Sequence, residues 1–158
     1  MSDRTHIALR EATPQDARFV WDVNNHPSVR ENSIDSDSIP WKDHKAWYAA
    51  ALESDQRVLW VGEVDGEGCG VVRMDVEADA KGAEISVAVR PKFRGRGIGR
   101  RLIRAGSERI LRRTDVDRVD ALIRPDNEAS IRTFEAAGYR PHDAVEREGV
   151  ELERFRYE

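Results

Sequence analysis

The chain has 158 residues, of which 39% are hydrophobic and 35% are charged. This length fits one domain with a single core, and apolar runs recur too regularly for a disordered protein. No stretch approaches the roughly 18 uninterrupted apolar residues that span a bilayer, and residues 1–10 do not resemble a signal peptide. Cys69 is the only cysteine, which excludes an internal disulfide and is typical of a reducing compartment. We therefore expect one cytoplasmic domain without a membrane partner.

The net charge of −4 conceals a basic segment. Residues 90–113 carry ten arginines and lysines and one acid, Glu108, so the remainder of the chain is strongly acidic. A short basic segment in an acidic chain favours a discrete polyanionic ligand over a nucleic-acid track. A solvated helix face is the better interpretation of the arginines at the end of this segment.

The first third of the chain predicts a strand followed by helices. Thr13 is a suitable helix cap, Pro14 suits the first helical position, and Pro27 opens a new element. The expected elements are a strand over 6–10, a helix from Thr13 to about residue 25, a short turn or helix from Pro27, a polar loop over 32–40 and a helix over 41–53.

The rest of the chain predicts strands that alternate with two further helices. Gly66 and Gly68 mark a turn, Gly106 permits close packing of a helix on a sheet, and Gly138 ends the last helix. The expected elements are strands over 57–64, 70–76 and 83–89, a helix from about Gly97 to Arg113, a strand over 118–123, a helix over 127–137, and strands over 139–145 and 150–157. This order is mixed α/β, with one sheet covered by helices.

The segment Arg94-Gly95-Arg96-Gly97-Ile98-Gly99 carries the strongest chemical signal. It follows a strand and enters a helix, so its glycines let backbone N–H groups converge at the helix N-terminus. That arrangement suits a pyrophosphate, with charge-assisted contacts from Arg94, Arg96 and Arg100. The spacing excludes the G-x-G-x-x-G dinucleotide fingerprint, and no Gly-Lys-Ser/Thr is present to make a P-loop.

Residues 94–99 resemble the R/Q-x-x-G-x-G/A motif of the GNAT superfamily of acyl-CoA N-acyltransferases. Residues 85–91 resemble that family's fourth strand. Asn127-Glu128-Ala129-Ser130, with Phe134 and Gly138-Tyr139, resembles its N-x-x-A/S…F/Y-x-x-x-G-F/Y helix. The resemblance implies a single-domain α/β GNAT fold over residues 1–158: a mixed, mostly antiparallel central sheet flanked by helices, with splayed fourth and fifth strands.

The resemblance also implies the donor and its binding residues. Acetyl-CoA would be the acyl donor, without a metal, and an amine acceptor would attack the thioester directly. Backbone groups of Val87 and Val89 would pair with the pantetheine amides, and the N–H of Val89 or a neighbour would stabilise the oxyanion. The implied cofactor-binding residues are Val87, Ala88, Val89, Arg94, Gly95, Arg96, Gly97, Ile98, Gly99, Arg100, Asn127, Ser130 and Phe134.

Two positions depart from patterns within the family. Phe134 stands where many relatives have a tyrosine that protonates the leaving thiolate, so the general acid is unassigned and water can serve. Leu122 stands where the branch that acetylates ribosomal proteins has a glutamate base. Glu84 is the first candidate base because it lies upstream of Val89 on the same strand, although an ion-paired glutamate is an equal alternative. His44 is the second candidate, and a helix-surface histidine is the commoner alternative.

The N-terminal part resembles a subgroup related to the pseudaminic-acid pathway N-acetyltransferase, which acetylates a nucleotide-linked amino sugar. The resemblance rests on residues 21–30 and on Ser33, Ile39, Trp41, His44 and Trp47; Val23 and Asp43 depart from it. The candidate acceptor-binding residues are Asn24 and Ser33 for hydroxyls, Arg30 for a diphosphate, and Trp41 or Trp47 for stacking. The alternatives are core packing for the tryptophans, favoured for Trp47, and a structural ion pair for Arg30.

The leading hypothesis is acetylation of a small-molecule amine, with an amino sugar or its nucleotide conjugate as the acceptor. The alternatives are acetylation of a protein N-terminus or lysine, and a catalytically silent acyl-CoA-binding module. Nucleic-acid binding through residues 90–113 is the least favoured. We expect a monomer or a homodimer.

Overall fold

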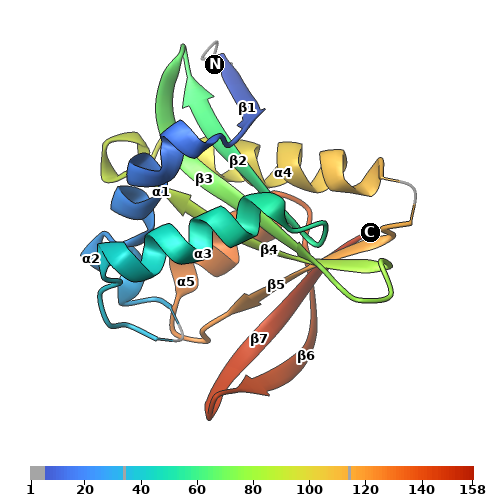
Figure 1. Ribbon diagram of the computed structural model, residues 1–158. Coiled ribbons are helices and arrows are strands. Elements are labelled where there is room, and N and C mark those ends of the chain that lie inside the picture. Colours follow the sequence, from blue (N-terminus) through green and yellow to red (C-terminus); the bar gives the residue numbers. More distant parts are fainter. Residues whose placement is uncertain (1–5, 34, 114) are drawn as a thin grey trace.

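The computed structural model describes residues 6–33, 35–113 and 115–158. Within them a seven-stranded sheet, ordered β1-β2-β3-β4-β5-β7-β6, lies between helices on its two faces (Figure 1). The elements are β1 (Ile7–Glu11), the 3-10 turn η1 (Pro14–Asp16), α1 (Ala17–Asn24), α2 (Pro27–Arg30), α3 (Trp41–Glu53), β2 (Arg57–Val64), β3 (Glu67–Val76), β4 (Gly82–Val89), the 3-10 turn η2 (Pro91–Phe93), α4 (Ile98–Leu111), β5 (Arg118–Ile123), α5 (Glu128–Ala136), β6 (Arg140–Arg147) and β7 (Val150–Tyr157). The predicted element order and α/β class are confirmed.

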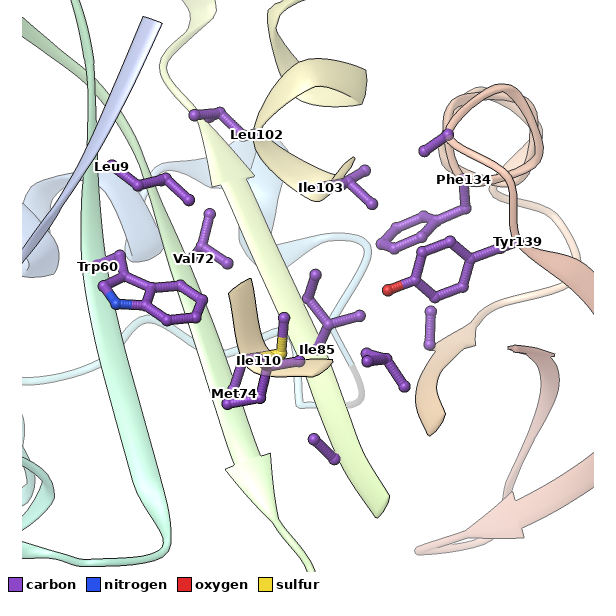
Figure 2. Packing of buried hydrophobic residues seen from close by; sticks show 14 of the residues in the cluster. Leu9, Trp60, Val72, Met74, Ile85, Leu102, Ile103, Ile110, Phe134 and Tyr139 are labelled. Atoms are coloured by element: carbon purple, nitrogen blue, oxygen red, sulfur yellow. The ribbon is translucent and has the colours of Figure 1, made fainter. Parts of the chain in front are cut away.

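Side chains of the central strands alternate between two hydrophobic cores. On β3, Val72 and Met74 point into the larger core beneath α4 and α5, which Figure 2 shows from close by. Val71 points to the opposite face and packs with residues of α1 and α3, among them Val20 and Tyr48. The valine-rich strands are therefore buried on both faces where helices cover them.

Strands β4 and β5 form the parallel pair of this sheet, and they pair only at their beginnings. The register joins Gly82 to Arg118, Ala83 to Val119 and Glu84 to Asp120. Beyond these positions β4 continues beside β3, while β5 pairs with β7 as far as Ile123. The carboxyl ends of β4 and β5 are therefore separated, which is the splay that the sequence predicted.

Two buried side chains of helix α3 bond the segment that runs from Thr13 to the first residue of α1. The Tyr48 hydroxyl donates to the Thr13 carbonyl oxygen at 2.6 Å, and His44 Nε2 donates to the Ala17 carbonyl oxygen at 2.9 Å. His44 is only 3% exposed, and its ring stacks between the rings of Trp41 and Tyr48. His44 is thus buried with one committed nitrogen, and the alternative of a helix-surface histidine is wrong.

Gly106 lets α4 approach the sheet closely. A Cβ atom at this position would lie 3.2 Å from Val72 Cγ1 and 3.3 Å from the Trp60 ring, so the helix backbone rests directly on β2 and β3. The close packing that the sequence predicted at this glycine is confirmed.

We predict that Gly106→Val destabilises the protein by about 1–3 kcal/mol, because its methyl groups overpack the contact with Val72 and Trp60. Urea unfolding followed by far-UV circular dichroism measures this change. The control is Arg104→Val, on an exposed position of the same helix, where we expect a loss below about 1 kcal/mol. A Gly106→Val protein as stable as the wild type would contradict close packing at this point.

Burial lowers the pKa of His44 from its ordinary value of 6.5. The unfolded chain then binds a proton at a higher pH than the folded protein does, so the free energy of unfolding falls as the pH drops below about 6.5. We predict that His44→Gln removes part of this fall between about pH 7.5 and about pH 5, as measured by urea unfolding. Exposed His142→Gln, the control, should follow the wild type; identical slopes for His44→Gln and the wild type would refute the buried histidine.

Candidate functional site

A cleft of about 1240 Å³ opens where β4 and β5 part. Its walls come from β4, β5, α4 and α5 and from the segment around α2. Most of the predicted site residues line it: Asn24, Arg30, Ser33, His44, Glu84, Val87, Ala88, Val89, Arg94, Gly95, Gly97, Ile98, Gly99, Arg100, Asn127, Ser130 and Phe134. Two do not, Arg96 and Trp41.

The loop between η2 and α4 needs glycine at two positions. Gly95 has φ of +76° and Gly97, the residue that caps α4, has φ of +73°, a region that other residues rarely adopt. The first N–H groups of α4 have no acceptor within the helix, and they carry its partial positive charge. This turn therefore points polarised backbone donors at the open end of the cleft.

Gly99 has a different role from the one we expected. It lies inside α4 with helical geometry, so it is not required for the turn. A Cβ atom at Gly99 would lie 3.6 Å from Val89 Cγ2 on β4 and 3.7 Å from Thr133 Cγ2 on α5. Gly99 therefore keeps open the space between the two walls of the cleft.

The motif arginines have three different environments. Arg94 donates from Nε to the Val89 carbonyl oxygen at 3.0 Å and from Nη1 to the Ser28 hydroxyl at 2.7 Å, so it ties the loop to α2. The Arg96 guanidinium lies over the ring of Phe93, 5.6 Å from its centroid and outside the cleft. Arg100 lines the cleft beside Gly97.

The α5 wall has no hydroxyl at Phe134, the position to which the resemblance assigned a tyrosine acid. Phe134 is buried and packs edge to face on Tyr139, with 5.0 Å between ring centroids. The Tyr139 hydroxyl bonds the buried Ser107 hydroxyl instead of the cleft, and burial raises the pKa of Tyr139. Tyr139 therefore does not replace the missing acid.

Asn127 caps α5, because its side-chain oxygen accepts from the Ser130 backbone N–H at 3.3 Å. Its amide nitrogen is the part of the side chain that remains for a ligand in the cleft.

Glu84 lines the cleft as an ion-paired carboxylate. Arg147 Nη1 lies 3.0 Å from both of its oxygens, and the Glu84 side chain is 28% exposed. Glu84 is therefore ion-paired, with a partner from the end of β6, and it also faces the cleft, where a base would be needed. The same face of β4 carries Ser86, whose hydroxyl accepts from Arg73 Nη2 at 3.2 Å.

The segment that contains α2 is tied across the cleft. Arg30 donates to the carbonyl oxygens of Asp35 and Asp37. The alternative of a structural ion pair is therefore wrong, because these partners are backbone oxygens of the loop. The Ser33 hydroxyl donates to the Val29 carbonyl oxygen at 2.9 Å. The Ser33 carbonyl oxygen accepts from Arg124 at the end of β5, at 2.8 Å and 3.1 Å.

The two tryptophans do not lie where the sequence suggested: Trp47, for which core packing was favoured, lines the cleft, and Trp41 does not. Trp41 packs edge to face on Trp21 at 5.3 Å, under the guanidinium of Arg18 and away from the cleft. Trp47 lines the cleft, with Arg73 5.5 Å from the centroid of its ring. A stacking role for Trp41 in the cleft is therefore not supported by its position.

Sequence reasoning missed Arg73, Ser86, Arg124 and Arg147 as cleft residues. Arg73 had a readable signal, because a charged residue interrupts a valine-rich strand there. Arg147 had none, since only the fold of the β6–β7 hairpin places it beside Glu84.

Two general properties of the described residues bear on the chemistry. They contain no group of three or more histidine, cysteine, aspartate or glutamate side chains placed to hold a metal ion. None of their helices combines the length and the apolarity needed to traverse a bilayer.

Solved structures with the same fold include two N-acetyltransferases. An aminoglycoside acetyltransferase AAC(6')-Ib in complex with coenzyme A superimposes with a TM-score of 0.85 at 19% identity, over 96% of this chain and 94% of that one. A spermidine N-acetyltransferase from Vibrio cholerae, in complex with CoA and spermine, superimposes with a TM-score of 0.84 at 15% identity, over the same shares of the two chains. At these identities the likeness establishes the fold.

Sequence comparison establishes the family. An acetyltransferase of Sodalis glossinidius is 30% identical over 106 residues, which are 67% of this chain and 73% of that protein. One of Pectobacterium atrosepticum is 30% identical over the same share of this chain and 74% of its own. The model of the Acetyltransferase (GNAT) family matches residues 16–139, which include the glycine turn, both walls of the cleft and α2. The chain belongs to the Acetyltransferase (GNAT) family.

Proposed function

We propose that this protein transfers the acetyl group of acetyl-CoA to the primary amine of a small molecule. The observation that carries the proposal is the open edge of β4 next to the glycine turn at the head of α4. The related structures bind CoA, and their acceptors, aminoglycosides and polyamines, are small-molecule amines.

The backbone of β4 presents donors and acceptors to the cleft. The Arg90 N–H donates to Cys69 on β3, so alternation along the strand turns the N–H and C=O groups of Val87 and Val89 away from β3, towards the gap. Arg94 already occupies the Val89 carbonyl oxygen. Both groups of Val87 and the N–H of Val89 are then available to an extended amide chain such as pantetheine, which would add to the edge of β4.

The helix end of the cleft fits a pyrophosphate. The donors at the head of α4 and the Arg100 guanidinium supply positive charge there, and Gly99 leaves the passage between β4 and α5 open. An extended donor substrate would then run from the head of α4 down towards Glu84.

Transfer needs a nucleophile, an oxyanion site and two proton movements. The acceptor nitrogen attacks the thioester carbon, a C–N bond forms, and the C–S bond breaks as the thiolate leaves. The N–H of Val89 or Val87 stabilises the oxyanion, and Glu84 takes the ammonium proton directly or through water. Water protonates the thiolate, because Phe134 has no proton to give.

For the acceptor we propose an amino sugar or its nucleotide conjugate. Asn24, at the end of α1, and Trp47, on α3, line the acceptor side and can bond a hydroxyl and stack on a sugar ring. The bond from Arg124 to Ser33 ties the α2 segment to the end of β5, which disfavours a long peptide acceptor because that needs an open groove. Thiol release with acetyl-CoA and a panel of amines, followed by mass spectrometry of the products, tests this assignment.

We predict that Gly99→Leu abolishes binding of CoA while the protein remains folded. The leucine side chain would fill the passage between Val89 and Thr133. Isothermal titration calorimetry measures the binding, and circular dichroism checks the fold.

Gly99→Ala is the matched control. Its methyl group makes ordinary contacts at 3.6 Å and 3.7 Å, so we expect CoA affinity within about threefold of the wild type. Equal affinity of the leucine variant and the wild type would show that CoA does not pass between β4 and α5.

We predict that Glu84→Gln lowers kcat by about 100-fold, the lower end of general-base contributions, with little change in acetyl-CoA affinity. Steady-state thiol release and calorimetry give the two quantities. The control is Glu77→Gln, which removes another ion-paired glutamate, 3.1 Å from Arg118 and outside the cleft, and should leave kcat unchanged. Unchanged turnover in Glu84→Gln would remove this residue from the role of base.

A further inference from the structure

The cleft has a charge balance opposite to that of the chain. The protein carries a net charge of −4, yet the described residues that line the cleft include seven arginines and two carboxylates, Asp43 and Glu84. Three of these arginines come from the glycine loop, α4 and α5, which form the part of the cleft that fits a pyrophosphate. The other four, Arg30, Arg73, Arg124 and Arg147, come from other elements, and the binding of CoA proposed above does not use their charge.

Two of these four arginines donate to backbone carbonyl oxygens. Arg30 donates to those of Asp35 and Asp37, and Arg124 donates to that of Ser33. A carbonyl dipole orients a guanidinium but does not neutralise its charge, so Arg30 leaves a positive field in the cleft.

Arg147 lies nearest to the candidate base. Its contact with Glu84 is made by one nitrogen, Nη1, to both carboxylate oxygens, and 45% of the side chain is exposed. A guanidinium has five N–H donors in a planar fork, so donors on Nε and Nη2 remain for a second anion beside Glu84. The tight β6–β7 turn, with φ of +53° at Glu148 and +77° at Gly149, holds Arg147 at the end of its strand.

Arg73 adds a second guanidinium on the same face of the sheet. In the β3–β4 register it lies opposite Ser86, two residues along β4 from Glu84, and it donates to the Ser86 hydroxyl. Asp75 is shared between Arg73, at 3.3 Å, and Arg57, at 3.5 Å, so one carboxylate serves two cations. The floor of the acceptor site therefore retains positive charge.

We infer that Arg147, with Arg73, binds an anionic group of the acceptor beside the amine that Glu84 deprotonates. This inference rests on the proposed function and narrows its substrate class. The acceptor is an amine that carries a carboxylate or a phosphate a few bonds from its nitrogen, such as an amino acid or a 2-amino sugar 1-phosphate. A polyamine or an aminoglycoside would bring additional positive charge against these guanidiniums, so this site selects against the acceptors of the related structures.

Matched pairs of acceptors test the inference. One pair is glucosamine 1-phosphate and glucosamine, and the other is an α-amino acid and its amide; spermidine is the polycationic comparison. Initial rates of thiol release with acetyl-CoA give kcat/KM for each. In at least one pair we expect the anionic member to be favoured by about tenfold or more, the size of one charge-assisted contact, and spermidine to be the poorest substrate. The pair that shows the preference identifies phosphate or carboxylate as the anion.

Variants then show which residues cause the preference for the anionic acceptor. Arg147→Gln should raise KM for the anionic member by about tenfold and remove the difference within the pair, while Arg147→Lys should retain part of it. Arg73→Gln, a second and independent variant, should reduce the same ratio. Arg140→Gln, at the other end of β6 and outside the cleft, is the control that should keep it. Acetyl-CoA binding by calorimetry verifies that each variant is folded.

The outcomes separate the inference from the proposed function. Acetylation of all amines without a charge preference, a preference for spermidine, or a preference that survives Arg147→Gln overturns the anionic acceptor and leaves the acetyltransferase intact. A protein that acetylates no amine in the panel overturns both.

Discussion

The structure depends on the point at which β4 and β5 stop pairing. Three residue pairs join the strands, from Gly82 and Arg118 to Glu84 and Asp120. Beyond them the backbone groups on one edge of β4 have no strand to bond, although buried peptide groups need partners. An extended ligand with its own amides satisfies them. Because α4 begins shortly after β4 ends, and α5 shortly after β5, two helix N-termini meet at the opening of the same gap.

The two halves of the cleft are bonded to each other by arginines. Arg94 belongs to the glycine loop and bonds Ser28 of α2, and Arg124 belongs to the end of β5 and bonds Ser33. The segment that lines the acceptor side is thereby held by residues next to the donor side. Both bonds are accepted by neutral oxygens, a hydroxyl and a backbone carbonyl, and they stabilise the geometry of the cleft.

Local signals predicted much of this arrangement. Glycine at positions 95 and 97 indicated a turn with positive φ, because other residues rarely adopt it. The helix periodicity and the valine-rich strands predicted the element order. Side-chain partners were harder to predict. His44 and Trp41 lie one turn apart on α3, yet His44 lines the cleft and Trp41 does not, because the packing of α3 on α1 decides which side of the helix faces the gap.

The sequence by itself determined the family, the element order and the glycine turn, since these follow from residue type and spacing along a continuous segment. Only the tertiary structure decided the acceptor side. The contact between Glu84 and Arg147 joins residues 63 positions apart, and that between Arg124 and Ser33 joins residues 91 positions apart. Such pairs leave no periodic trace in one sequence, because it is the register of the sheet and the packing of its helices that bring them together.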